Sequence, residues 1–338
     1  MLTDLKSNLN PGEKLLLALC RLDFSEEQKK GILRLLKEEL DWERYLKLVN
    51  EHGIIALEAY NIRELGLSDQ VPEGVMKILD NARMKTLLRN TWLTRQWKEV
   101  NKILSGAGIK HVLLKGMALE HTVYNSQGLR QMNDVDILVK KEDVIRSWQL
   151  LQDHGFKPDP VKSPLHEKII SDIGKHMPTL RKDGFPVEIH HRLFHEPEKN
   201  SQLGKAIDEA IPVEVEGMKA CVLRDDILIE FLRNHMEDHI SGGDFQLRLW
   251  LDIDLISSGS APALTEELIV NPHLTLKKKL KRIYYRTHFL TLPRETRLRY
   301  LAGDIFPSLK WMKKRYNCST LKALLFYPGR IGKILWIL

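Results

Sequence analysis

Apolar residues recur at helical spacing through the first hundred residues of the chain. Ser25 and Gln28 have the spacing of a capping box, and the apolar repeat that follows them predicts an amphipathic helix. A second helix is predicted over Trp42–Tyr60. A third, longer helix is predicted to follow Pro72 and to end near Gly106, where two glycines flank an alanine. The pattern therefore predicts a helical N-terminal region.

Short segments of alternating type follow these glycines. His111–Leu114 is a brief apolar run that predicts a buried strand, because it is too short for an independent helix. Gly116–Tyr124 predicts a short helix and Asn133–Val139 predicts a strand. Glu142–His154 predicts a further helix, which Gly155 ends.

A hairpin is predicted where Asp183-Gly184 separates two alternating runs, His176–Arg181 and Phe185–His190. Helical spacing then returns, and four more helices are predicted: Asp225–His239, Gln246–Ser257, Leu274–Leu290 and Leu321–Leu338. The fold class that follows is α/β (α+β), with a short mixed sheet and flanking helices. The expected organisation is a core at 106–205 between helical regions at 1–105 and 206–338.

The composition is that of a folded protein rather than a disordered one, since 43% of the 338 residues are hydrophobic and 29% are charged. A net charge of +7 at neutral pH favours anionic partners such as nucleotides or RNA, without identifying one. The basic stretches Lys277–Arg286 and Lys310–Arg315 are typical of solvated helix faces. An RNA-binding helical protein with incidental acids remains an alternative.

Two features bear on cellular location. The cysteines are far apart in the sequence, and no signal peptide is recognised at the N-terminus, so a reducing cytoplasm is expected. The apolar stretch Leu321–Leu338 is interrupted by Pro328, glycines and basic residues, and it is too short to span a membrane. It predicts a packed terminal helix, with a basic amphipathic surface helix as the alternative.

Two aspartates at alternate positions indicate a metal site. Asp134 and Asp136 lie on a predicted strand, where residues two apart project from the same face. Magnesium commonly takes one or two carboxylates together with substrate phosphates. Upstream, Lys115 and Gly116 lie where a predicted strand runs into a helix, and backbone N–H groups at such a place can hold phosphate. The alternative is a pair of solvated acids at a strand end.

Asp252 and Asp254 repeat this spacing in a different setting. They lie in Leu247–Ile256, whose apolar positions predict a helix. Residues two apart on a helix point about 200° away from each other, so these acids cannot easily share one ion. Asp252 and Asp254 are therefore interpreted as structural.

Two-metal chemistry requires a third acid, and Glu188 is the candidate. It shares a predicted strand face with His190, while its apolar neighbours pack on the opposite face. The alternative is a surface acid on a hairpin, in which case Asp183 or Glu196 would replace it.

Histidine-rich patterns offer weaker metal sites. One group that could suggest zinc comprises His190, His191, His195 and Glu196. Its first two members fall on opposite faces of a strand, and a convincing fourth ligand is lacking. His235 and His239 have the spacing of a helical metal pair but not the H-E-x-x-H pattern, and packed or capped histidines are commoner. His176 could approach an acceptor, although a surface histidine is the simpler interpretation.

One stretch combines several of these motifs: LLKGMALEHTVYNSQGLRQMNDVDILVKKEDV, followed by HGF and GFPVEIHHRL. It resembles a family of uncharacterised bacterial nucleotidyltransferases within the DNA polymerase β-like superfamily, which carries an L-K-G…Y…G-x-R-x-x-x-D-x-D-x-L-V signature. The resemblance covers roughly residues 109–193. The later segments DDILIEFLRNHMEDH and LRLWLDIDLI resemble the helical part of that family.

The resemblance implies a polymerase β-like core that transfers a nucleotidyl group from a nucleoside triphosphate such as ATP, with Mg²⁺ or Mn²⁺, to an acceptor. By position in the signature, the metal-binding and catalytic residues would be Asp134, Asp136 and Glu188, and the phosphate-binding residues would be Lys115, Gly116 and Arg130. Met117 departs from the superfamily, which has Gly or Ser there, and the spacing from Gly116 to Asp134 is longer than usual. The acceptor could be a small molecule, RNA or a protein. A non-catalytic nucleotide-binding or regulatory module is the alternative.

Overall fold

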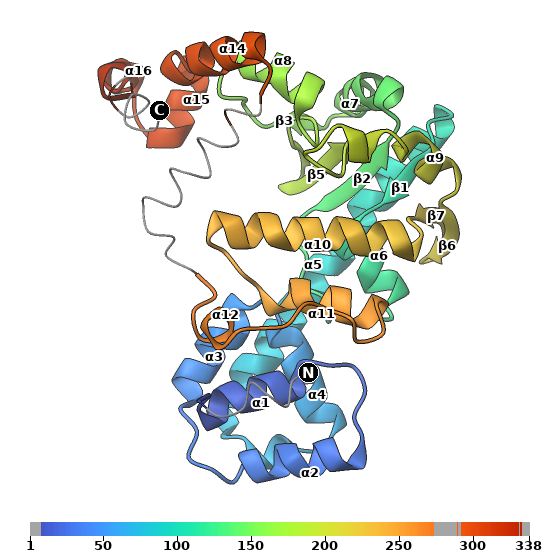
Figure 1. The fold of residues 1–338 in the computed structure, drawn as a ribbon, viewed down its shortest axis with the longest axis vertical. Coiled ribbons are helices and arrows are strands. Elements are labelled where there is room, and N and C mark those ends of the chain that lie inside the picture. The colour runs from blue at the N-terminus through green and yellow to red at the C-terminus, as the bar shows by residue number, and fades with distance from the viewer. Residues whose placement is uncertain (1–7, 274–288, 290–291, 331, 333–338) are drawn as a thin grey trace. The chain divides into compact units, whose positions relative to one another are not determined.

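The computed structural model describes residues 8–273, 289, 292–330 and 332 (Figure 1). Its N-terminal helices are α1 (Pro11–Leu19), α2 (Glu26–Leu35), α3 (Trp42–Glu51), α4 (Ile55–Glu64) and α5 (Glu73–Gly106). The predicted capping box of α2 is confirmed, because the side chains of Ser25 and Gln28 each accept a hydrogen bond from the other's backbone N–H. The long helix predicted after Pro72 is also confirmed.

The prediction of one helix over Trp42–Tyr60 is wrong, because this stretch holds two helices. Helix α3 ends at Glu51 and α4 begins at Ile55. Between them Gly53 has a φ of 68°, in the left-handed region that glycine adopts without steric cost. A Cβ at this position would lie 2.6 Å from the Arg248 side chain. The turn therefore requires glycine.

In the described part of the chain, seven strands form a mixed sheet in the order β3-β4-β5-β2-β1-β7-β6. They are β1 (His111–Leu113), β2 (Val135–Val139), β3 (Lys157–Pro158), β4 (Leu180–Lys182), β5 (Phe185–His190), β6 (Ile211–Val215) and β7 (Met218–Val222). Strand β1 is parallel to β7, with Leu113 opposite Val222. The β3–β4, β4–β5 and β6–β7 pairs are antiparallel. The predicted α/β class is confirmed.

The β4–β5 hairpin turns at Asp183 and Gly184, as predicted. Both residues have positive φ, 51° and 87°, which is what a type I′ turn requires. The pairing places Leu180 opposite Val187. Before the start of β4, His176 forms an isolated antiparallel bridge with His190. The hairpin thus brings two histidines together at the end of β5.

Strand β2 begins at Val135, two residues later than predicted, so Asp134 lies directly before the strand. All five β2 residues are buried, as expected for a central strand that is covered on both faces. The helices that accompany the strands are α6 (Lys115–Thr122), α7 (Val144–Asp153), α8 (Pro164–Ile173) and α9 (Leu203–Asp208). Gly155, with a φ of 89°, follows α7 as predicted.

The later helices are α10 (Asp225–Gly242), α11 (Leu247–Ile256), α12 (Glu266–Val270), α14 (Arg294–Ile305), α15 (Leu309–Tyr316) and α16 (Thr320–Leu325). The first two confirm predictions. The predicted helix Leu274–Leu290 lies outside the described residues except for Phe289. A continuous helix over Leu321–Leu338 is not found, because α16 ends at Leu325, and residues 331 and 333–338 lie outside the described part. None of the described helices is long and apolar enough to cross a membrane.

The chain divides into two compact units. The first comprises residues 1–99, 113–135 and 209–275, and the second comprises residues 100–112, 136–208 and 276–338. In the first unit α1 packs against α2, α3 and α4, and α10 packs against α11. In the second unit α7 packs against β5, and α8 packs against α14.

Candidate functional site

An acid–histidine cluster lies in the second unit. Asp136 comes from β2, and Glu188 and His190 come from β5, the next strand in the sheet. One potential ligand atom of each residue lies within 4.8 Å of the other two. The Nε2 atom of His190 is 2.7 Å from Asp136 Oδ1 and 3.6 Å from Glu188 Oε2. Asp136 and His190 are buried, and the Glu188 side chain is 18% exposed.

The alternation of residues along β5 produces this cluster. Val187 and Ile189 are buried and alternate with the polar residues Glu188 and His190. The sequence prediction that Glu188 and His190 share one strand face is confirmed, because both belong to the cluster. Glu188 and Asp136, which were expected to hold one metal, both belong to this cluster. The contact of His190 with Asp136 was not predicted, because it depends on strand pairing between residues 54 positions apart.

Neighbouring groups keep Glu188 ionised. Burial by itself raises the pKa of the Glu188 carboxyl, but the interaction with His190 and the charge of His176 outweigh burial, so the pKa lies below its ordinary value. Thr179 donates a hydrogen bond of 2.9 Å to Glu188 Oε1, and His176 Nε2 lies 3.6 Å from Oε2. Glu188 is therefore a carboxylate at neutral pH.

The donor set fits a divalent cation. Carboxylate oxygens suit Mg²⁺ and Mn²⁺, and an imidazole nitrogen suits transition ions. Two carboxylates held this close, away from bulk water, are stabilised by a nearby positive charge. In the described structure His190 donates a hydrogen bond from its Nε2–H to Asp136, while its buried Nδ1 has no hydrogen-bond partner. Asp136 and Glu188 are thus suited to hold magnesium or manganese.

The other histidine patterns do not form such a site in the described residues. His191 and His195 are not members of the cluster, and His195 is exposed. On α10 the rings of His235 and His239 lie 4.7 Å apart in an edge-on arrangement, and His239 Nδ1 is 3.4 Å from Asp244. These contacts favour the packing interpretation of that pair.

Asp134 and a group of positive side chains lie in the first unit. Asp134 is half-buried and directly precedes β2. The negative charge of Asp134 favours the protonated forms of Arg130 and Arg248, although other groups affect the pKa of each arginine more strongly. Burial is the main influence on Arg248, whose pKa is lowered to about 10. Arg248 was not among the predicted site residues, although it lies in the segment LRLWLDIDLI that carried part of the family resemblance.

Lys115 and Gly116 open helix α6. Lys115 has a φ of 47°, and a Cβ on Gly116 would lie 2.9 Å from the Met132 side chain, so the chain is tightly packed here. Burial lowers the pKa of His239, Asp244 opposes this, and the positive charges of Arg248 and Lys115 add smaller lowering effects. Lys115 and Arg248 therefore both lie within electrostatic reach of His239 on helix α10.

Arg130 forms a buried ion pair with Asp252. Its Nε lies 3.0 Å from both carboxylate oxygens, and its Nη2 lies 2.6 Å from Oδ2. Tyr124 donates a further hydrogen bond of 2.9 Å to Asp252. Asp252 lies on helix α11, as predicted, and it has the structural role that its helical setting indicated. The phosphate contact expected for Arg130 stays a prediction.

Gly128 fixes the loop that carries Arg130. It has a φ of 70°, and a Cβ on it would lie 2.8 Å from the Leu87 backbone. The backbone N–H groups of Gly128 and Arg130 both donate to the buried carboxylate of Glu120, at 2.5 and 3.0 Å. The glycine and arginine of the G-x-R motif therefore build the loop that leads into Asp134.

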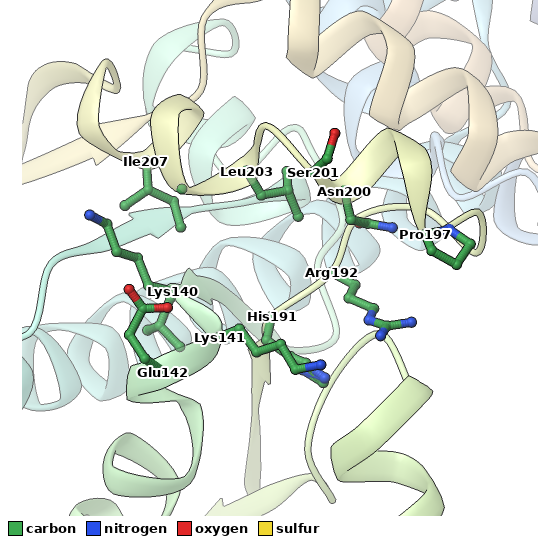
Figure 2. A pocket seen from close by; sticks show the side chains of 12 residues that line it. Lys140, Lys141, Glu142, His191, Arg192, Pro197, Asn200, Ser201, Leu203 and Ile207 are labelled. Carbon is green, nitrogen blue, oxygen red and sulfur yellow. The ribbon is translucent and has the colours of Figure 1, made fainter. Parts of the chain in front are cut away.

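A separate cavity of about 240 Å³ lies next to the residues that follow β2 and β5 (Figure 2). Its lining includes Lys140, Lys141, His191 and Arg192, but none of the three residues of the acid–histidine cluster. His191 is buried, and within the described structure neither ring nitrogen has a hydrogen-bond partner. Burial, followed by the charges of Arg192 and Lys141, lowers the pKa of His191 to about 4, so its ring is neutral at physiological pH.

Comparison with protein families gives a match over most of the chain. A model of the family described as uncharacterised nucleotidyltransferase matches residues 38–290, which is most of the chain. The matched range includes the acid–histidine cluster, Asp134 and the start of helix α6. A search of curated proteins found no match.

Proposed function

The chain belongs to this nucleotidyltransferase family, and from that premise we propose that it transfers a nucleotidyl group from a nucleoside triphosphate to an acceptor, with release of pyrophosphate. The observation that carries the proposal is the buried cluster of Asp136, Glu188 and His190. Carboxylates gathered in this way suit metal-assisted displacement at phosphorus. The family match and the donor set thus support the same chemistry.

Asp134, Asp136 and Glu188 would hold magnesium, or manganese in its place. Asp136 and Glu188 belong to the cluster, and Asp134 is included because one residue separates it from Asp136 along the chain. When bound, the metal neutralises charge on the triphosphate and lowers the pKa of the acceptor hydroxyl. His190 positions Asp136 through the 2.7 Å hydrogen bond, as outer-shell partners of metal ligands commonly do.

Lys115 and Gly116 would bind the triphosphate, and Arg248 would add positive charge. Lys115 and Gly116 lie in the first turn of α6, where backbone N–H groups lack helical partners and favour anions. Arg248 would act through its charge, because its Nε and Nη1 hydrogen bonds go to other protein groups. Arg130 directs its hydrogen bonds to Asp252 and to the Gln131 carbonyl, so we assign to it a contribution through charge rather than through direct contact.

In the transfer step, the acceptor oxygen bonds to the α-phosphorus while the bond from that phosphorus to the bridging oxygen breaks. Pyrophosphate leaves with the electron pair of the broken bond. Glu188 accepts the acceptor's proton, because it is held in the carboxylate form and keeps some exposure. The acceptor itself could be a small molecule, RNA or a protein.

The test is label transfer. The full chain is incubated with cell extract, Mg²⁺ and each α-labelled nucleoside triphosphate in turn, and mass spectrometry identifies what acquires the label. We expect transfer by the wild type and none by Asp136→Asn, with Asp254→Asn as the matched control because it makes the same change on helix α11. Circular dichroism checks that each variant is folded.

Two results would replace the proposal. Binding of Mg-NTP without pyrophosphate release, whatever acceptor is offered, would indicate a non-catalytic nucleotide-binding module. RNA binding that depends steeply on salt and is indifferent to magnesium would indicate an RNA-binding protein whose acids are incidental.

A further inference from the structure

The positive charge of the chain is concentrated at its C-terminal end. Residues 276–338 contain 16 lysines and arginines and two acidic residues, a net charge of +14. The other 275 residues contain 36 basic and 43 acidic residues, a net charge of −7. The overall charge of +7 therefore comes from a basic segment attached to an acidic protein. Such a segment attracts an anionic partner that the rest of the chain repels.

Large apolar side chains are exposed in the described part of this segment. The most exposed are Leu298 on α14, Phe306 after it, and Leu321 and Leu325 on α16, at 72%, 67%, 78% and 78%. Leu321 and Leu325 are four residues apart, so they lie on one side of α16. Apolar residues this exposed, and grouped in one segment, indicate a surface that another apolar phase covers.

Basic and apolar side chains occur on helices that pack together. Helix α15 has the sequence LKWMKKRY, with no acidic residue, and it packs against α16. The rings of Tyr316 and Phe326, at the ends of these helices, stack with their centres 4.4 Å apart. Lys310, Lys313 and Arg315 are exposed, whereas Lys314 pairs with Asp159. The α15–α16 pair therefore presents cations, aromatic rings and leucines together.

From this combination we propose that residues 294–330 bind the surface of a bilayer that contains anionic phospholipid. Cations attract the lipid head groups, and leucine and phenylalanine side chains enter the boundary between head groups and acyl chains. Nucleic acid would account for the charge but not for the exposed leucines, because phosphate contacts need cations alone. The surface lies outside the acid–histidine cluster, so this inference is independent of the proposed catalysis.

The experiment is sedimentation of the full chain with vesicles. One preparation contains phosphatidylcholine alone, and the other contains phosphatidylcholine with one third phosphatidylglycerol. We expect binding to the anionic vesicles to be at least about tenfold tighter, and to weaken when salt is raised to about 0.5 M. A Leu321→Ser, Leu325→Ser double variant should bind the anionic vesicles about tenfold less tightly.

A matched control makes the same change on the first unit. Ile78 and Leu88 on α5 are 50% and 55% exposed, and the Ile78→Ser, Leu88→Ser double variant should bind like the wild type. All of these positions are exposed, and thermal unfolding verifies that both variants fold. Equal binding to both kinds of vesicle, or equal binding by the two double variants, would overturn the proposal. So would preferential binding of single-stranded RNA that the leucine substitutions leave unchanged.

Discussion

The ion pair between Arg130 and Asp252 allows a quantitative test of the fold. Asp252→Asn keeps the size of the side chain but removes its charge, and it leaves the guanidinium of Arg130 buried without its paired acid. The two side chains are 5% and 0% exposed, so water cannot replace the lost partner. Breaking a buried pair by removing one member costs about 3–5 kcal/mol.

The lower end of that range is expected for this variant. The amide oxygen of asparagine can still accept a hydrogen bond from Tyr124 or Arg130, so the loss should be about 3 kcal/mol. That is a large share of the stability of an ordinary domain, which is about 5–15 kcal/mol. Urea unfolding followed by circular dichroism measures it.

Two further variants complete the test. Asp254→Asn makes the same change two residues away at a half-buried acid whose pKa burial raises, and it should alter stability by less than about 1 kcal/mol. Replacing both partners, with Arg130→Met and Asp252→Leu, should recover most of the loss because no charge is left unpaired. If Asp252→Asn unfolds at the same urea concentration as Asp254→Asn, the burial argument is wrong.

Three further predictions concern the site and the first unit. Glu188→Gln should reduce Mg-NTP affinity by less than about tenfold but turnover by about a hundredfold or more. Calorimetry measures the affinity and label transfer measures the turnover on the same preparation. Near-normal turnover would indicate that Glu188 is only a surface residue of the hairpin. NTP should bind the wild type only with a divalent cation, because Asp134 and Asp136 otherwise repel the triphosphate, and equal calorimetric affinity with EDTA would contradict this. Burial lowers the pKa of His52 from 6.5 to about 4, and its neutral ring bonds to the Ile269 carbonyl at 2.8 Å and the Leu247 N–H at 3.3 Å. As the pH falls, His52 is protonated in the unfolded chain before it is protonated in the folded chain. Its contribution to the free energy of unfolding is therefore complete above pH 6.5, and up to about 3 kcal/mol is lost toward pH 4. His52→Gln should flatten that part of the stability–pH curve, and an unchanged slope would contradict this prediction.

The sequence predicted those helix ends and turns that depend on neighbouring residues. The capping box at Ser25, the glycine after α7 and the Asp183-Gly184 turn each fix the backbone through neighbouring residues. The Trp42–Tyr60 helix was wrong because its apolar spacing continues across Gly53, which turns the chain and whose lack of a Cβ permits the close approach of Arg248. That approach joins residues far apart in the sequence, so periodicity carries no sign of it.

The contacts of the candidate site also divide into local ones, which the sequence predicted, and long-range ones, which it did not. Strand alternation placed Glu188 and His190 on one face, which needs only the residues of β5. The bond from His190 to Asp136 and the pairing of Arg130 with Asp252 connect residues 54 and 122 positions apart. These contacts arise from strand order and helix packing, and residue types alone do not specify them.

The loop of Gly128 and Arg130 has a consequence for how relatives diverge. Its glycine is fixed by backbone geometry and its arginine by a buried acid, so both should persist under selection for folding alone. A related protein that lost Asp136 or Glu188 would lose metal-dependent catalysis but would keep this loop and Asp252, its partner on α11. Relatives that differ in catalytic activity should therefore share the G-x-R motif and Asp252. The acids of β2 and β5 would be the positions that distinguish catalytically active relatives from inactive ones.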